Sequence, residues 1–251
     1  MNNSEKTSVH SFHIPVMGIA FTIDTPIKVA HYGISSVMSL VDDELIEQMR
    51  EFHSKENHIS YELIAIKDTD SRARRITAYL NLVHFLVKRN FERVKESAFE
   101  TGSEITKYFD LLKDSNPLKI AYLNMLQLPE GNEKTSAQAD LRSQMKPGSI
   151  DVNIMTKLDR TNFNRGKKLA TEFNDAHAAL RGYANSDLSS SIVLSAGMNP
   201  RLFGYMEEFA DFYPNSTGEI KKKIILKVSD YRSAVIQGKF LAKKGLWVSE
   251  Y

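Results

Sequence analysis

The sequence predicts an α/β fold built on parallel strands, and three observations support this prediction. An apolar, strand-like segment at 12–21 leads into Thr25 and Pro26, which are typical of a helix N-cap and of the first helical position. Gly33 then ends this helix, and "ISSVMSLV" (34–41) follows as a second strand. A crossover this short between two apolar strands favours a parallel sheet covered by helices. Doubly wound sheets and (β/α) barrels share this pattern.

Composition and charge restrict the classes of partner. The chain has 251 residues, with 33 basic and 31 acidic side chains, so that the balanced charge gives no indication of a nucleic acid partner. The absence of cysteine excludes disulfides and thiolate ligands and agrees with a reducing cytoplasm. The polar residues 1–11 contain no apolar core of a signal peptide or membrane span. We therefore expect a cytoplasmic protein, without a membrane or nucleic acid partner, that begins with a disordered tail.

A helical region interrupts the strand pattern between residues 68 and 146. Apolar residues recur there at helical spacing, as in Ile76, Leu80, Val83 and Val87. Shorter helices are expected at 102–113 and 117–128, followed by a loop at 128–136. We therefore divide the chain into a first β-α-β unit at 1–41 and a mainly helical insertion at 42–148, followed by further β/α units at 149–251.

The last part of the chain returns to alternating strands and helices. Strands are expected at 149–159, 189–200, 221–230 and 246–251, and helices at 164–183, 201–212 and 231–244. With the two strands of the first unit, this gives about six strands. A (β/α) barrel requires eight. The sequence therefore predicts an incomplete sheet and a chain that is truncated.

Three stretches carry a resemblance to a known family. They are "PVMGIAFTIDTPIKVAHYGISSVMSL" (15–40), "DVNIMTK" (151–157) and "IILKVSDYRSAVIQGKFLAKKGLWVSEY" (224–251). The first places Met17-Gly18 before Thr25-Pro26, and the second contains Val152-Asn153. These features resemble the nitronate monooxygenases, also called 2-nitropropane dioxygenases, which are FMN-dependent TIM-barrel enzymes. The resemblance does not cover residues 42–148.

The resemblance implies a (β/α)8 TIM-barrel fold, here incomplete, and flavin-mediated oxidation of a small organic substrate. A glycine after the first strand lets the backbone approach the flat ring of FMN, and a cation is needed where negative charge accumulates on reduction. The implied cofactor-binding residues are Met17, Gly18, Ile19, Ala20, Phe21, Thr22, Asn153, Ser195 and Gly197, and the implied catalytic residues are Lys157 and Lys227. The histidine-bearing Gly-Gly-His stretch of the family and its phosphate-binding glycine loops have no counterpart here, so the chain alone is expected to be inactive.

Two other functions stay open. One is a non-catalytic scaffold that self-associates through an exposed edge strand at 245–251. The other is an aldolase-type lyase in which Lys157 or Lys227 forms a Schiff base with the substrate. The seven histidines form no His-x-x-x-His pair, so a metal site is not expected. The sequence also lacks G-x-G-x-x-G, Walker and G-x-S-x-G motifs, which weakens the doubly wound nucleotide-binding alternative.

Overall fold

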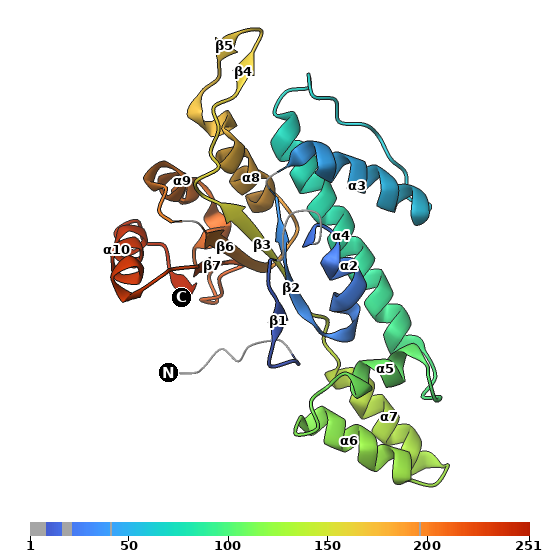
Figure 1. Ribbon diagram of the computed structural model, residues 1–251. Coiled ribbons are helices and arrows are strands. Elements are labelled where there is room, and N and C mark those ends of the chain that lie inside the picture. Colours follow the sequence, from blue (N-terminus) through green and yellow to red (C-terminus); the bar gives the residue numbers. More distant parts are fainter. Residues whose placement is uncertain (1–8, 17–21, 41, 196) are drawn as a thin grey trace. The chain divides into compact units, whose positions relative to one another are not determined.

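Six short strands form one parallel sheet (Figure 1). We analysed a computed structural model, which describes residues 9–16, 22–40, 42–195 and 197–251. In sheet order the strands are β1 (His13–Ile14), β2 (Ser35–Ser39), β3 (Ile150–Met155), β6 (Ser190–Ser195), β7 (Lys222–Leu226) and β8 (Val248–Glu250). A separate antiparallel hairpin consists of β4 (Phe163–Asn164) and β5 (Lys167–Lys168).

The strand order agrees with the barrel type of α/β fold. Strands of this sheet that follow one another along the chain are also neighbours in the sheet. A doubly wound sheet would instead reverse its order at a switch point. The sheet remains open, with β1 and β8 at its two edges. The predicted parallel α/β fold with about six strands is therefore confirmed, and it is consistent with an incomplete barrel.

Most helices begin at side-chain caps that the sequence supplies locally. Asp42 accepts hydrogen bonds from the backbone N–H groups of Glu44 and Leu45, and Gly33 (φ +81°) ends the first helical segment as predicted. The α-helices are α2 (Thr25–Val29), α3 (Asp43–Glu56), α4 (Ser71–Glu96), α5 (Glu104–Asp110), α6 (Pro117–Gln127), α7 (Asn132–Gln144), α8 (Asp175–Ala184), α9 (Pro200–Tyr205) and α10 (Tyr231–Ala242). Short 3-10 turns cover Ala30–Tyr32, Thr171–Phe173, Met206–Glu208 and Ala210–Phe212.

Three predicted elements differ from the structure. The helix expected at 164–183 is α8 only from Asp175 onward, because a hairpin and an irregular loop precede it. The loop expected at 128–136 ends early, since α7 begins at Asn132 and buries Leu141 on its inner side. The strand expected at 12–21 is described only as β1, and residues 17–21 lie outside the described residues.

The chain divides into two compact units, and each has its own apolar core. The first unit comprises residues 1–15, 25–36 and 85–149. Its buried cluster is rich in aromatic side chains, and the rings of Phe109 and Tyr122 stack with centroids 4.9 Å apart. Helices α5, α6 and α7 supply most of this cluster.

The second unit comprises residues 16–24, 37–84 and 150–251 and holds β3, β6, β7 and β8. Alternate residues of these strands, such as Ile154, Ile192 and Ile224, are buried between the sheet and its helices. The hydroxyl of Thr77 donates to the carbonyl of Gly182 at 2.9 Å, which joins the first half of α4 to α8. This unit contains the candidate site.

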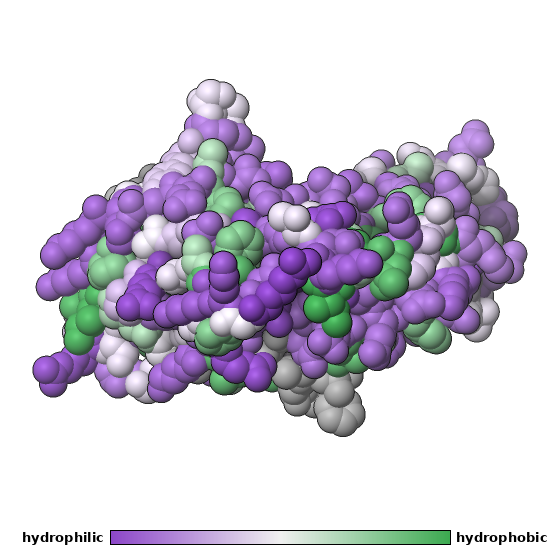
Figure 2. All heavy atoms as spheres, turned by 90° about the horizontal axis from the view of Figure 1, so that it is seen from above, coloured by the Kyte–Doolittle hydropathy of each residue, from purple (hydrophilic) through white to green (hydrophobic). Residues whose placement is uncertain are grey.

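The view in Figure 2 shows a mainly hydrophilic surface, on which hydrophobic side chains form small separate patches. Scattered exposed apolar residues of this kind are normal for folded proteins. None of the described helices combines the length and the apolar character that crossing a lipid bilayer requires.

Candidate functional site

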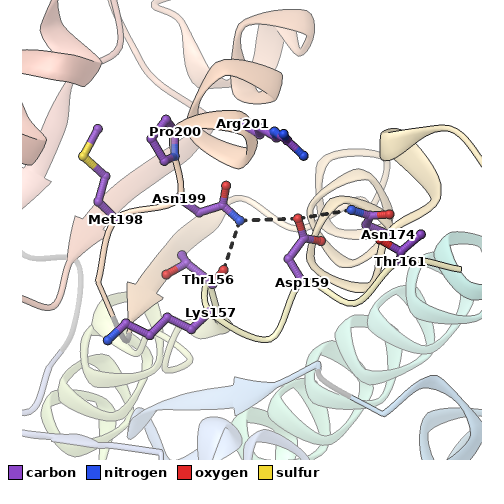
Figure 3. Close-up of a pocket in the computed structure, with 9 residues that line it drawn as sticks. All are labelled: Thr156, Lys157, Asp159, Thr161, Asn174, Met198, Asn199, Pro200 and Arg201. Carbon is purple, nitrogen blue, oxygen red and sulfur yellow. Dashed lines mark hydrogen bonds between the residues drawn. The ribbon is translucent and has the colours of Figure 1, made fainter.

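An open hollow of about 520 Å³ lies where β3 and β6 end, and two loops form its walls (Figure 3). The carboxyl ends of neighbouring parallel strands meet at one edge of a sheet, where α/β proteins bind their ligands. The lining residues are Thr156, Lys157, Asp159, Thr161 and Asn174 from the β3–α8 loop, Met198 and Asn199 from the β6–α9 loop, and Pro200 and Arg201 from the first turn of α9. Its volume falls within the range of about 300–1,000 Å³ that small-molecule sites occupy.

Thr156 and Asn199 connect the two loops. Asn199 is the N-cap of α9, and its Oδ1 accepts from the backbone N–H of Leu202 at 3.1 Å. Its Nδ2 donates across the hollow to the carbonyl of Thr156 at 3.0 Å. The hydroxyl of Thr156 in turn donates to the carbonyl of Ser195 at 2.7 Å. The floor of the hollow is therefore fixed by bonds between β3 and β6.

Asp159 is the most highly connected side chain of the hollow. Its Oδ1 accepts from the backbone N–H of Ala176 at 3.1 Å, and its Oδ2 lies 3.0 Å from Nδ1 of His177. Asn174 and Asn199 also turn their amide nitrogens toward Oδ2, at 3.5 and 3.4 Å. Burial alone raises the pKa of Asp159, but its hydrogen bonds and the charge of His177 outweigh burial and lower this pKa. Asp159 is therefore a carboxylate that holds both loops.

A buried polar network continues behind Asp159. His177 is buried in α8, and its ring centroid lies 5.3 Å from that of Tyr205. The hydroxyl of Tyr205 accepts from Nη1 of Arg181 at 3.0 Å, and Nε of Arg181 donates to Asp70 at 2.8 Å. Because each side chain of this network contacts another member, the network supports a rigid wall for the hollow.

Three groups that line the hollow lack partners. Lys157 and Arg201 are exposed, and neither makes a hydrogen bond or ion pair with the residues that the structure describes. Asn174 is only 6 % exposed, and its Oδ1 has no donor within the described part of the chain. The amide nitrogen of Asn174 faces Asp159, which as a carboxylate only accepts hydrogen bonds. A buried acceptor without a donor costs about 1–3 kcal/mol.

Four of the predicted site residues gather at this edge of the sheet. The amide nitrogen of Asn153 donates to the carbonyl of Val193 at 3.0 Å and to the hydroxyl of Ser195 at 2.9 Å. Gly197 has φ +97°, and a Cβ added to it would lie 3.1 Å from Cε of Lys157. The glycine therefore leaves room for the stem of Lys157. Asn153 and Ser195 face each other inside the sheet and are buried.

The other predicted site residues lie elsewhere or are not described. The strand expected at 221–230 is β7 only from Lys222 to Leu226, so Lys227 lies just after the strand and is exposed. The buried lysine of β7 is Lys222, at the opposite end of the strand. Thr22 is buried and is not among the residues that line the hollow. Met17, Gly18, Ile19, Ala20 and Phe21 lie outside the described residues.

Sequence reasoning missed the residues that build the hollow: Asp159, Asn174, His177, Asn199 and Arg201. Local signals did exist, because "TKLD" ends a predicted strand in an acidic residue and "NP" predicts a helix start after the next strand. The partners of Asp159 lie 15–40 residues away in the chain, so no periodicity reveals them. Within the ranges that the structure describes, no group of three or more histidine or acidic side chains is arranged to hold a metal ion.

Comparisons with known proteins do not narrow the function of this site. No family model matches the sequence, and searches of curated proteins and of solved structures found no match.

Proposed function

We propose that this chain carries the flavin-ring side of an FMN-dependent oxidoreductase that oxidises a small organic substrate. The resemblance of its terminal stretches to the nitronate monooxygenases supports the proposal. The single observation that carries it is the position of the hollow, at the carboxyl ends of two strands in a parallel sheet of barrel order. Lys157 and Gly197, both implied by the resemblance, lie at that edge.

The residues present fit one side of a flavin ring. A flavin pocket needs close approach of the backbone, polar groups along the ring edge and a cation near the developing negative charge. Gly197 makes room for the stem of Lys157, Thr156 and Asn199 fix the floor, and Lys157 is an exposed cation without a partner in the described ranges. When bound, FMN supplies electron or hydride transfer. The chain's own residues orient the ring and hold a positive charge beside it.

The Schiff-base alternative has less support. A lysine that forms a Schiff base is usually desolvated in an apolar pocket or lies beside another cation. Lys157 and Lys227 are both exposed. We therefore prefer the flavin proposal.

The proposal can be tested by titrating the full chain with FMN and with riboflavin. Quenching of the flavin fluorescence reports binding. We expect saturable binding of both with similar affinity, because the hollow would contact the ring and not the phosphate. Lys157→Met should weaken the binding of reduced flavin about tenfold, or about 1.4 kcal/mol, because the cation is then lost. Anaerobic titration calorimetry measures this loss, since reduced flavin hardly fluoresces.

Lys239→Met is the matched control, since Lys239 is an exposed lysine on α10 and does not line the hollow. It should leave flavin binding unchanged. The proposal is wrong if neither flavin quenches saturably at about 1 mM, where binding would contribute only about 4 kcal/mol.

A further inference from the structure

The hairpin of β4 and β5 projects beyond the ends of β3 and α8 and carries a concentrated positive charge (Figure 1). Residues 160–171 contain four basic and no acidic side chains, whereas the whole chain has 33 basic and 31 acidic ones. We infer that this hairpin binds a single-stranded nucleic acid. The inference is independent of the proposed function. It departs from the expectation of no nucleic acid partner, because that expectation rested on the net charge of the whole chain.

The base of the hairpin is fixed to the start of α8. Nε of Arg160 lies 3.0 Å from Oδ2 of Asp175, the first residue of this helix. The amide nitrogen of Asn162 donates to Oδ1 of the same carboxylate at 3.1 Å. The hairpin is therefore presented in a defined position, while its tip stays exposed.

The tip carries three cations that are available to an anionic partner. Arg165, Lys167 and Lys168 are exposed, and their side chains make no hydrogen bond or ion pair with the residues that the structure describes. Arg165 has φ +48°, a backbone conformation that asparagine or glycine adopts at lower cost than a bulky residue does. A cation thus occupies the turn at a cost in stability, which is typical of functional positions.

The register of the hairpin places an aromatic ring beside one of these cations. Phe163 pairs with Lys168 and Asn164 pairs with Lys167, and directly opposite residues of an antiparallel pair share a face. Both strands are exposed, and Phe163 is 65 % exposed. A two-stranded hairpin without a covering layer is at best marginally stable in water. A partner that covers the face of Phe163 and Lys168 would therefore stabilise it.

A nucleotide combines the two groups that this face would contact. Its base stacks on an aromatic ring, and its phosphate pairs with a neighbouring cation. An acidic protein segment supplies the charge but no flat ring at each residue. An anionic membrane requires a larger apolar surface, and Phe163 is the only large apolar side chain within 163–168. In a duplex the bases are stacked on one another, so a single strand is the form that fits.

Fluorescence anisotropy with labelled oligothymidylate and oligouridylate, each of about 15 nucleotides, tests the inference on the full chain. We expect saturable binding, with the logarithm of the association constant falling by about 2 for a tenfold rise in salt, at about 0.7 for each of three phosphate contacts. A higher affinity for one of the two oligonucleotides would show whether the partner is DNA or RNA.

Two variants separate stacking from charge. Phe163→Leu keeps an apolar side chain but removes the flat ring, so it should weaken binding about tenfold. Arg165→Asn removes one cation and also relaxes the turn, so that weaker binding cannot result from loss of the hairpin. This variant should lower the dependence on salt by about 0.7.

Arg232→Asn is the matched control, because Arg232 is an exposed arginine on α10, outside the hairpin, and it should leave the affinity unchanged. The inference is overturned if neither oligonucleotide binds at low salt, or if either Phe163→Leu or Arg165→Asn binds as the unchanged chain does. Displacement of the oligonucleotide by polyglutamate at equal charge would indicate an acidic protein partner. Tighter binding to phosphatidylserine vesicles would indicate a membrane surface. Either of these results also overturns the inference.

Discussion

Lys222 is the most deeply buried charged side chain among the described residues, and its contacts explain why it is tolerated. Its ammonium donates to the carbonyls of Tyr183, Ser186 and Leu188 at 2.9–3.0 Å. It also lies 4.5 Å from the ring centroid of Tyr183. Burial, with a smaller effect of the charge on Lys221, lowers the pKa of Lys222 to about 8, so the ammonium form persists at neutral pH. Lys222 therefore satisfies the carbonyls at the end of α8.

Replacing Lys222 should reveal how much these contacts stabilise the protein. Lys222→Met preserves most of the side-chain volume but removes three hydrogen bonds to buried carbonyls, although the carbonyl of Tyr183 also accepts from Ser186. We expect the free energy of unfolding in urea to fall by about 3 kcal/mol, at about 1 kcal/mol for each lost hydrogen bond. Lys223→Met is the control on the same strand, and because Lys223 is exposed it should change stability by less than about 0.5 kcal/mol. A similar loss in both variants would contradict this account of Lys222.

Single residues were predictable where their role is local. Gly33 ends a helical segment and Asp42 caps α3, because each acts on backbone groups a few residues away. The same local reasoning did not show which lysine of "KKKIILK" (221–227) is buried. Which end of β7 is buried depends on carbonyls that lie 34–39 residues earlier in the chain. The partners of Asp159 escaped prediction for the same reason.

Among the elements, the hairpin of β4 and β5 is the clearest failure of the sequence prediction. Arg165 (φ +48°) and Gly166 (φ +77°) form its two-residue turn, and two positive φ values indicate a type I′ turn. Asparagine or glycine usually precedes the glycine of such a turn, so arginine gave no hairpin signal. The helical pattern that follows becomes a helix only at Asp175.

Arginine in the left-handed region weakens this turn, which predicts the effect of a substitution. Arg165→Asn should stabilise the hairpin by about 1 kcal/mol, because asparagine tolerates positive φ better. Hydrogen exchange of the Leu169 amide, which donates to the carbonyl of Asn162 at 2.9 Å, should then slow about fivefold. Arg165→Lys is the control and should leave the exchange rate unchanged. Unchanged or faster exchange in Arg165→Asn would show that the turn is not the weak point of the hairpin.

At the scale of the whole molecule, the parallel sheet was predictable and the division into units was not. The first β-α-β unit occupies only residues 13–39, so the parallel direction of its two strands follows from a short connection. The first unit instead collects three separate stretches, 1–15, 25–36 and 85–149. Their shared aromatic cluster arises from tertiary packing, which hydrophobic periodicity within one helix does not reveal.

The open edge of the sheet at β8 is where the self-associating scaffold alternative can be tested. Trp247 is the only tryptophan, is 67 % exposed, and directly precedes β8. Because β8 has three residues and ends at the exposed Glu250, it is a poor template for pairing with another chain. We expect Trp247 emission to stay at the long wavelength of an indole in water, open to acrylamide, at all protein concentrations in the micromolar range. A shift to shorter wavelength on concentration, with larger particles in light scattering, would favour the scaffold, since pairing at this edge would bury the indole.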